Sequence, residues 1–193
     1  LGADLIGFHT AAYAAHFCDC VTRLLGVETV EEGRFEYQER SPRTGVFPMG
    51  ISLARFEASA TEGPFAGERR AADAAGAGKT LVAIDRLDYT KGIPRRLLAY
   101  EELLRQHPEL RERVTLVQVA VPSRTGVKAY RRFRRHVDAM VGRINGTYGT
   151  PSWTPINYLY QGFSHAELLA LFRMADVMLV TPVRDGMNLV AKE

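Results

Sequence analysis

Three polar segments of this sequence carry residue types that bind phosphate groups. In chain order, they are Asp85–Gly92, Pro122–Arg124 and Thr181–Leu189. The first two segments contribute the cations Arg86, Lys91 and Arg124. An arginine guanidinium presents a planar fork that matches phosphate oxygens, and a lysine ammonium is a mobile point charge. These residue types favour a ligand that carries phosphate, with the alternative that the cations are solvated or paired with aspartates of the same segments.

Each polar segment follows an apolar run that predicts a strand. The three expected strands are residues 80–87, 114–121 and 177–181. The carboxyl ends of parallel strands meet at one edge of a sheet, and the ligands of such sheets lie beyond that edge. A helix is expected to begin near Asn188, and the free N–H groups at its start favour an anion. One pocket that binds two phosphates would account for the three cations and for this helix.

Strands alternate with helices over the second half of the chain. Between the strands we expect a helix from Pro94 to just before Pro108, a helix from about Ser123 to Ile144, a strand at 156–161, and a helix from the capping box Ser164–Glu167 to about Met174. This alternation predicts an α/β fold, with a parallel sheet and helices on both faces. Upstream we expect a strand at 3–8, a helix over Thr10–Leu25, and a strand pair or irregular loop over 34–51.

Composition excludes several classes of protein. The chain has 193 residues, of which 46% are hydrophobic and 24% are charged, so it can bury a core and is not disordered. A formal net charge of +3 suits an acidic small substrate and does not require nucleic acid. Cys18 and Cys20 are too close together on a helix for a disulfide, which fits a reducing cytoplasm. No apolar run reaches the roughly 18 residues that a membrane helix needs.

A change of composition divides the chain. Residues 57–78 are rich in Ala, Gly, Glu and Arg and have no strong apolar period, which is typical of a linker or a surface helix between domains. The expected division is residues 1–56, the connecting segment 57–78, and residues 79–193. The sequence lacks an initiator Met and stops within an expected helix, so we expect an internal fragment of a longer protein.

Long motifs in these segments resemble those of the trehalose-6-phosphate synthase family, glycosyltransferase family 20. The matching stretches follow the family's order and cover nearly the whole chain outside 57–78: Ala3–Thr10, Phe47–Ile51, Asp85–Gly92, Gln118–Arg124, Gly142–Gly146 and Arg184–Glu193. The resemblance implies the GT-B fold. Residues 1–56 would then be the C-terminal part of the N-terminal, acceptor-side Rossmann-like domain. Residues 79–193 would be most of the C-terminal, nucleotide-sugar-binding Rossmann-like domain.

The resemblance also implies roles for individual residues. Arg86 and Lys91 match the pair that holds the donor diphosphate, and Arg124 matches the arginine that binds the acceptor phosphate. Asp185 begins the stretch that grips the hydroxyls of the donor glucose. The other donor-site matches are Phe163 beside the nucleobase, Gly186, Met187 and Asn188 at the sugar, Leu189 and Val190 at the phosphate and ribose, and Glu193 at the ribose. Of all these, Arg86, Lys91 and Asp185 are the expected catalytic residues.

The family transfers glucose, with retention of anomeric configuration, from a nucleotide diphosphate donor, usually UDP-glucose, to glucose-6-phosphate. The product is trehalose 6-phosphate, and the resemblance implies neither a cofactor nor a metal. The leaving phosphate would accept the proton of the acceptor. The sequence agrees in a limited way, because we find neither the carboxylate pair of retaining glycosidases nor a His/Asp ligand cluster. Catalysis would then depend on positioning and on stabilising diphosphate charge with Arg86, Lys91 and the helix near Asn188.

The resemblance leaves alternatives open. The family's glycine-rich acceptor loop and its site histidine and aspartate have no match here, so we expect no turnover by this chain alone. The acceptor could be that of a glucosylglycerol-phosphate synthase or of a pseudoglycosyltransferase of the same fold. A non-catalytic sugar-phosphate-sensing module is a third hypothesis. The donor nucleobase, a homo-oligomeric state and a following phosphatase domain stay undecided.

Three other signals carry less weight. Gly76–Thr80 resembles the end of a P-loop, but Asp73 stands where that motif needs glycine. His9 follows the first expected strand and could face a cleft, although a lone histidine there is more often structural. The basic run Lys128–Arg135 lies opposite an apolar helix face, so we expect it to be solvated and not to bind nucleic acid specifically.

Overall fold

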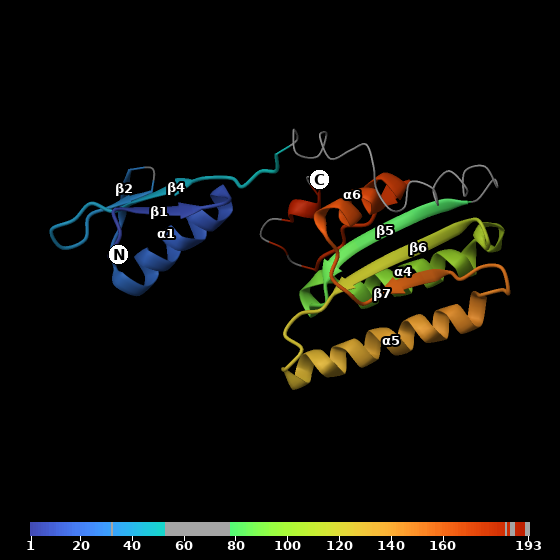
Figure 1. Ribbon diagram of the computed structural model, residues 1–193. Coiled ribbons are helices and arrows are strands. Elements are labelled where there is room, and N and C mark those ends of the chain that lie inside the picture. The colour runs from blue at the N-terminus through green and yellow to red at the C-terminus, as the bar shows by residue number, and fades with distance from the viewer. Residues whose placement is uncertain (32, 53–77, 184, 186–187, 192–193) are drawn as a thin grey trace. The chain divides into compact units, whose positions relative to one another are not determined.

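The computed structural model of the chain describes residues 1–31, 33–52, 78–183, 185 and 188–191 (Figure 1). Contacts divide these residues into two compact units. The first holds residues 1–51 and 188–191, and the second holds residues 52, 78–183 and 185. The expected connecting segment 57–78 lies outside the described residues except for Gly78, so the domain division stays a prediction.

The first unit is a four-stranded sheet with one helix. Its elements are β1 (Leu5–Phe8), α1 (Ala11–Leu25), β2 (Thr29–Glu31), β3 (Arg34–Phe35) and β4 (Arg43–Val46), and the strand order is β1-β4-β3-β2. Strands β1 and β4 are parallel, and the other neighbours are antiparallel. Thr10 caps α1 by accepting a hydrogen bond from the Tyr13 N–H at 3.3 Å, and Gly26 ends it in the left-handed conformation that suits glycine. The expected helix is confirmed.

The second unit is a parallel sheet covered on both faces. Its elements are β5 (Lys79–Arg86), η1 (Tyr89–Lys91), α4 (Ile93–Gln106), η2 (Pro108–Leu110), β6 (Val114–Val121), α5 (Lys128–Tyr148), β7 (Ile156–Leu159), α6 (His165–Met174) and β8 (Val177–Met178). The strand order is β7-β6-β5-β8, and every neighbouring pair is parallel. Figure 1 shows α4 and α5 on one face of this sheet and α6 on the other. The predicted α/β fold is confirmed.

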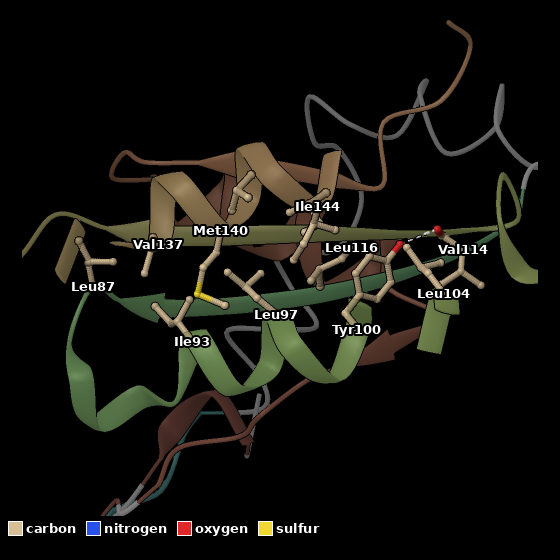
Figure 2. Close-up of a cluster of buried hydrophobic side chains, with 14 residues drawn as sticks. Leu87, Ile93, Leu97, Tyr100, Leu104, Val114, Leu116, Val137, Met140 and Ile144 are labelled. Carbon is tan, nitrogen blue, oxygen red and sulfur yellow. Dashed lines mark hydrogen bonds between the residues drawn. The ribbon is translucent and has the colours of Figure 1, made fainter. Parts of the chain in front are cut away.

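Alternation along the strands divides the core of this unit into two layers. On one face, Leu116 and its neighbours pack against α4 and α5, as Figure 2 shows. On the other face, Val117 and Val119 pack against Leu171 of α6. Tyr100 of α4 brings a hydroxyl into the first layer, where its single proton is shared between the carbonyl oxygens of Val114 at 2.7 Å and Pro155 at 3.0 Å. The buried polar group is therefore satisfied.

The structure corrects several expected element boundaries. The helix expected over Ser123–Ile144 runs from Lys128 to Tyr148, because Arg124 has a φ of 47° and cannot continue a helix. The strand expected at 3–8 begins at Leu5, and the strand expected at 156–161 ends at Leu159. The strand expected at 177–181 covers only Val177–Met178. The described part of the helix expected near Asn188 is the 3₁₀ turn η3 (Leu189–Ala191), and residues 192 and 193 lie outside the described residues.

Candidate functional site

The polar segments after β5 and β6 begin side by side at the carboxyl edge of the parallel sheet. The two strands pair in register up to Arg86 and Val121, and the Leu87 N–H donates to the Val121 carbonyl at 2.8 Å. Arg86 is exposed at this edge. Among the described residues, none makes a hydrogen bond or ion pair with its side chain, so its guanidinium is available to a ligand.

The turn Asp88–Gly92, which follows β5, is fixed to the segment that follows β8. Asp88 caps η1, because its carboxylate accepts from the backbone N–H of Thr90 at 3.0 Å and from the Thr90 hydroxyl at 2.9 Å. The Val183 N–H donates to the Thr90 carbonyl at 2.8 Å. Gly92 has a φ of 70°, and a Cβ there would lie 2.3 Å from the Thr181 carbonyl oxygen. The close approach of the two segments therefore requires glycine.

Lys91 and Asp185, two of the predicted site residues, form an ion pair. The Nζ atom of Lys91 lies 2.5 Å from Oδ2 of Asp185, and the two side chains are 15% and 21% exposed. The pair joins the turn Asp88–Gly92 to the segment after β8. A ligand that carries both an anion and hydroxyl groups can engage the ammonium and the carboxylate together, because the two groups lie at one place.

Beneath this edge lies a polar group of residues that we call the Arg96 cluster: Arg96, Asp85 and Gln118, which are buried, and Thr181, which is exposed. The Arg96 guanidinium donates to the Asp85 carboxylate at 2.7 Å, to the Gln118 amide oxygen at 2.9 Å and to the Thr181 hydroxyl at 2.9 Å. The side chains of Arg96 and Asp85 are 1% and 6% exposed. The cluster therefore ties β5, β6 and the segment after β8 to α4 at the level of the site.

Sequence reasoning missed Arg96. A signal was present, because Arg96 follows Ile93 and precedes Tyr100 at the spacing of the buried face of α4. An arginine on that face needs a buried partner. Asp85 is that partner, and burial raises the pKa of its carboxyl even though the Arg96 charge opposes the change.

Arg124 is linked to the turn Asp88–Gly92 through Tyr130. The Arg124 guanidinium donates to the Tyr130 hydroxyl at 3.0 Å, and that hydroxyl donates to the Asp88 carboxylate at 2.9 Å. Burial opposes ionisation of Asp88, but hydrogen bonds from the Thr90 backbone, from Tyr130 and from the Thr90 hydroxyl, together with the nearby Arg124 charge, outweigh it. The pKa of Asp88 is therefore below its ordinary value. Arg86, Lys91 and Arg124 thus all lie in segments that begin at one sheet edge.

The remaining predicted site residues are distributed as follows. Phe163 is partly buried and packs against the α6 layer. In the first unit, His9 is exposed, with its Nδ1 atom 3.3 Å from the Phe47 carbonyl oxygen. Asn188, Leu189 and Val190 are half-buried in the described C-terminal stretch. Three further predicted residues, Gly186, Met187 and Glu193, lie outside the described residues.

Two further properties bear on the kind of site. Within the described ranges, no group of three or more His, Cys, Asp or Glu residues is placed to hold a metal ion. No helix in those same ranges is long and apolar enough to span a bilayer.

The chain is similar to known proteins over its whole length. The sequence profile described as glycosyltransferase family 20 matches residues 1–193. The bifunctional trehalose-6-phosphate synthase/phosphatase of Thermoproteus tenax is 50% identical over 194 aligned residues, which cover 100% of this chain and 26% of that protein.

Solved structures share the fold of the chain. The E. coli trehalose-6-phosphate protein bound with UDP-2-fluoro glucose matches with a TM-score of 0.90 and 39% identity, over 98% of this chain and 42% of that one. The UDP-forming alpha,alpha-trehalose-phosphate synthase from Burkholderia xenovorans in complex with glucose-6-phosphate has a TM-score of 0.89 and 34% identity, over 98% and 42%. This chain thus spans 26% to 42% of the length of these relatives. Its fold is that of the GT-B glycosyltransferases, and the chain belongs to glycosyltransferase family 20.

Proposed function

We propose that this chain is the donor-binding part of a retaining glucosyltransferase that makes trehalose 6-phosphate from UDP-glucose and glucose-6-phosphate. One observation carries the proposal: Arg86, Lys91 and Arg124 all lie in segments at the carboxyl edge of one parallel sheet. Ligands of such sheets bind at this edge. The names of relatives that match the whole chain support the choice of donor, acceptor and product.

In this proposal, Arg86 and Lys91 bind the donor diphosphate and Asp185 binds hydroxyls of the donor glucose. The ion pair between Lys91 and Asp185 supports the assignment, because a nucleotide sugar carries its phosphates and its hexose next to each other. The donor replaces the carboxylate as the main partner of the ammonium. The Asp185 carboxylate is then free to accept hydrogen bonds from the sugar.

Other parts of the donor site belong to the same proposal. Phe163 lies beside the nucleobase, residues 186–190 contact the sugar, phosphate and ribose, and Glu193 binds the ribose. Arg124 binds the acceptor phosphate. The reaction uses no cofactor and no metal ion. The free cysteines Cys18 and Cys20 fit a cytoplasmic location.

The proposed mechanism stabilises the leaving group. Departure of the donor diphosphate leaves negative charge on its oxygens, and Arg86 and Lys91 hold cations where that charge develops. Fixed charges at such a place lower the barrier because they need no reorganisation during the reaction. The leaving phosphate takes the proton of the acceptor hydroxyl on the same face of the sugar, so the anomeric configuration is retained without an enzyme nucleophile.

Nucleotide release tests the proposal. The complete reading frame that contains this chain is given UDP-glucose with either glucose-6-phosphate or glycerol-3-phosphate, and UDP is measured. We expect release with glucose-6-phosphate alone. Release with glycerol-3-phosphate alone would assign the protein to glucosylglycerol-phosphate synthesis. A folded protein that binds UDP and releases none with either acceptor would contradict the enzymatic function and favour a sensing module.

A further inference from the structure

Arg124 stands in a backbone conformation that arginine rarely adopts. Its φ is 47°, in the left-handed region, and it lies in the short segment between β6 and α5. Such a conformation costs about 1–3 kcal/mol for a residue other than glycine and persists only where surrounding contacts impose it. The contacts that hold Arg124 therefore also fix where its guanidinium lies.

The Val127 N–H donates to the Arg124 backbone carbonyl at 2.9 Å, and Tyr130, on the first turn of α5, holds the Arg124 side chain. Its hydroxyl accepts a hydrogen bond from Nη1 of Arg124 at 3.0 Å, and the guanidinium carbon lies 5.5 Å from the centre of its ring. Both interactions use the side chain of Arg124 without neutralising its charge. Among the described residues, no carboxylate lies within ion-pair distance of this guanidinium. The cation is thus held through a neutral hydroxyl, and its charge acts on Asp88 without a direct ion pair.

The orientation of the Tyr130 hydroxyl is itself fixed. Its single proton is donated to Oδ2 of Asp88 at 2.9 Å, so a lone pair of the oxygen faces Arg124. Tyr130 is 6% exposed and Asp88 is 7% exposed, so the bond between them is buried, while the bond from the exposed Arg124 is partly buried. Oδ1 of Asp88 meanwhile accepts from Thr90, the residue before Lys91. A continuous set of hydrogen bonds therefore joins Arg124 to the turn that carries Lys91.

We propose that Tyr130 is a positioning residue for the acceptor phosphate, which it serves by holding Arg124 in register with the turn Asp88–Gly92. The inference rests on the proposed function, in which Arg124 binds that phosphate and Lys91 binds the donor. Tyr130 touches neither substrate. Its hydroxyl sets the distance between the acceptor arginine and the donor lysine, so that the two phosphate groups bind at a fixed separation.

Tyr130→Phe in the complete protein isolates this role, because it keeps the ring and removes only the hydroxyl. We expect the KM for glucose-6-phosphate to rise about five- to tenfold, the effect of losing one hydrogen bond of typical net strength. The KM for UDP-glucose and kcat should change less than about twofold. Tyr148→Phe is the matched control: Tyr148 ends the same helix, and Arg111 stacks on its ring with 5.1 Å between guanidinium carbon and ring centre.

A second variant separates positioning from general structural damage. In an Arg124→Ala background, Tyr130→Phe should have no further effect on the KM for glucose-6-phosphate, because there is no guanidinium left to position. A merely structural role would give the same factor in both backgrounds and would raise the KM of donor and acceptor together. Cooperative thermal unfolding of Tyr130→Phe and of Tyr148→Phe confirms that both variants fold.

The outcomes distinguish this inference from the function on which it rests. A wild-type protein that releases no UDP with glucose-6-phosphate overturns both. An active wild-type protein whose Tyr130→Phe variant has the same acceptor KM as the Tyr148→Phe control overturns the positioning role alone. The positioning role is supported if Tyr130→Phe raises the acceptor KM in the wild-type background but not in the Arg124→Ala background.

Discussion

Two arginines near the same sheet edge differ in how their charge is used. Arg96 is 3% exposed and donates to three partners, one of which is the Asp85 carboxylate. Arg124 is exposed, donates to a neutral hydroxyl and has no carboxylate partner among the described residues. The first cation is paired directly with a carboxylate, and the second reaches the Asp88 carboxylate only through the Tyr130 hydroxyl. An arginine in the first state can only organise the site, whereas one in the second state can bind an anion.

The Arg96 cluster places a buried ion pair beside two further polar partners. Burial raises the pKa of Asp85 despite the opposing Arg96 charge, which means that the charged form is disfavoured in the folded protein. Buried ion pairs often stabilise less than apolar residues of the same size would. What the cluster provides is geometry, because one guanidinium fixes β5, β6 and Thr181 relative to each other. The segment with Asp185 follows Thr181 directly.

The largest expected effect comes from breaking the ion pair between Arg96 and Asp85. Arg96→Ala leaves the Asp85 carboxylate buried without its partner, and we expect the free energy of unfolding to fall by about 3–5 kcal/mol. Urea denaturation of the complete protein measures it. Arg95→Ala, at the exposed neighbouring position, is the control and should change stability by less than about 0.5 kcal/mol. Equal effects of the two variants would contradict the distinction between the buried and exposed cations.

Removing both charges sharpens the same comparison. Asp85→Leu combined with Arg96→Met leaves no unpaired charge, and stability should recover to within about 1–2 kcal/mol of the wild type or exceed it. The affinity of this double variant for UDP-glucose should be lower than that of the wild type, because Thr181 lacks the guanidinium that fixes its segment. If donor affinity recovered together with stability, the cluster would have no organising role.

The next effect concerns the cations at the sheet edge. Arg86→Ala and Lys91→Ala should each weaken UDP-glucose binding by about 1.5–3 kcal/mol, the contribution of a hydrogen bond to a charged group, with little change in melting temperature. Calorimetric titration measures the affinity. Lys79→Ala is the matched control, because Lys79 lies at the opposite end of β5 and its side chain is 73% exposed. Affinity that is unchanged in both site variants would defeat the donor-site assignment.

Sequence predicted one of these two arginines and not the other, for a physical reason. Arg124 follows a recognisable apolar strand, so its place at the sheet edge could be derived from the pattern of parallel sheets. Arg96 is positioned by partners that lie 11, 22 and 85 residues away, and no local pattern brings those together. Even for Arg124, the expected helix start was wrong, because Arg124 has a left-handed backbone in a turn that the Val127 N–H closes onto the Arg124 carbonyl, and α5 begins only at Lys128.

The same limit applies to Lys91 and Asp185. The sequence did not decide whether Lys91 is solvated, paired with an aspartate such as Asp185, or bound to a ligand. Spacing cannot choose among these states, because residues 91 and 185 meet only when β8 pairs with β5. The α/β fold itself was predictable, since strand–helix alternation is repeated along the chain and does not depend on any single contact.

The smallest expected effect is a pH dependence of stability at Asp88, where burial partly offsets the hydrogen bonds that favour its charged form. Because the pKa of Asp88 is lowered in the folded protein, its contribution to stability is present above its unfolded pKa of about 3.9 and is lost as pH falls through the folded value. The stability difference between wild type and Asp88→Asn should therefore be constant above about pH 5 and shrink in stronger acid. Urea denaturation over a pH series measures it, with Asp138→Asn on α5 as the control. A difference that stayed constant down to the acid limit would mean that the hydroxyls of Tyr130 and Thr90 bind the neutral side chain equally well. The hydrogen bonds between Arg124 and the donor turn would then not depend on the carboxylate charge.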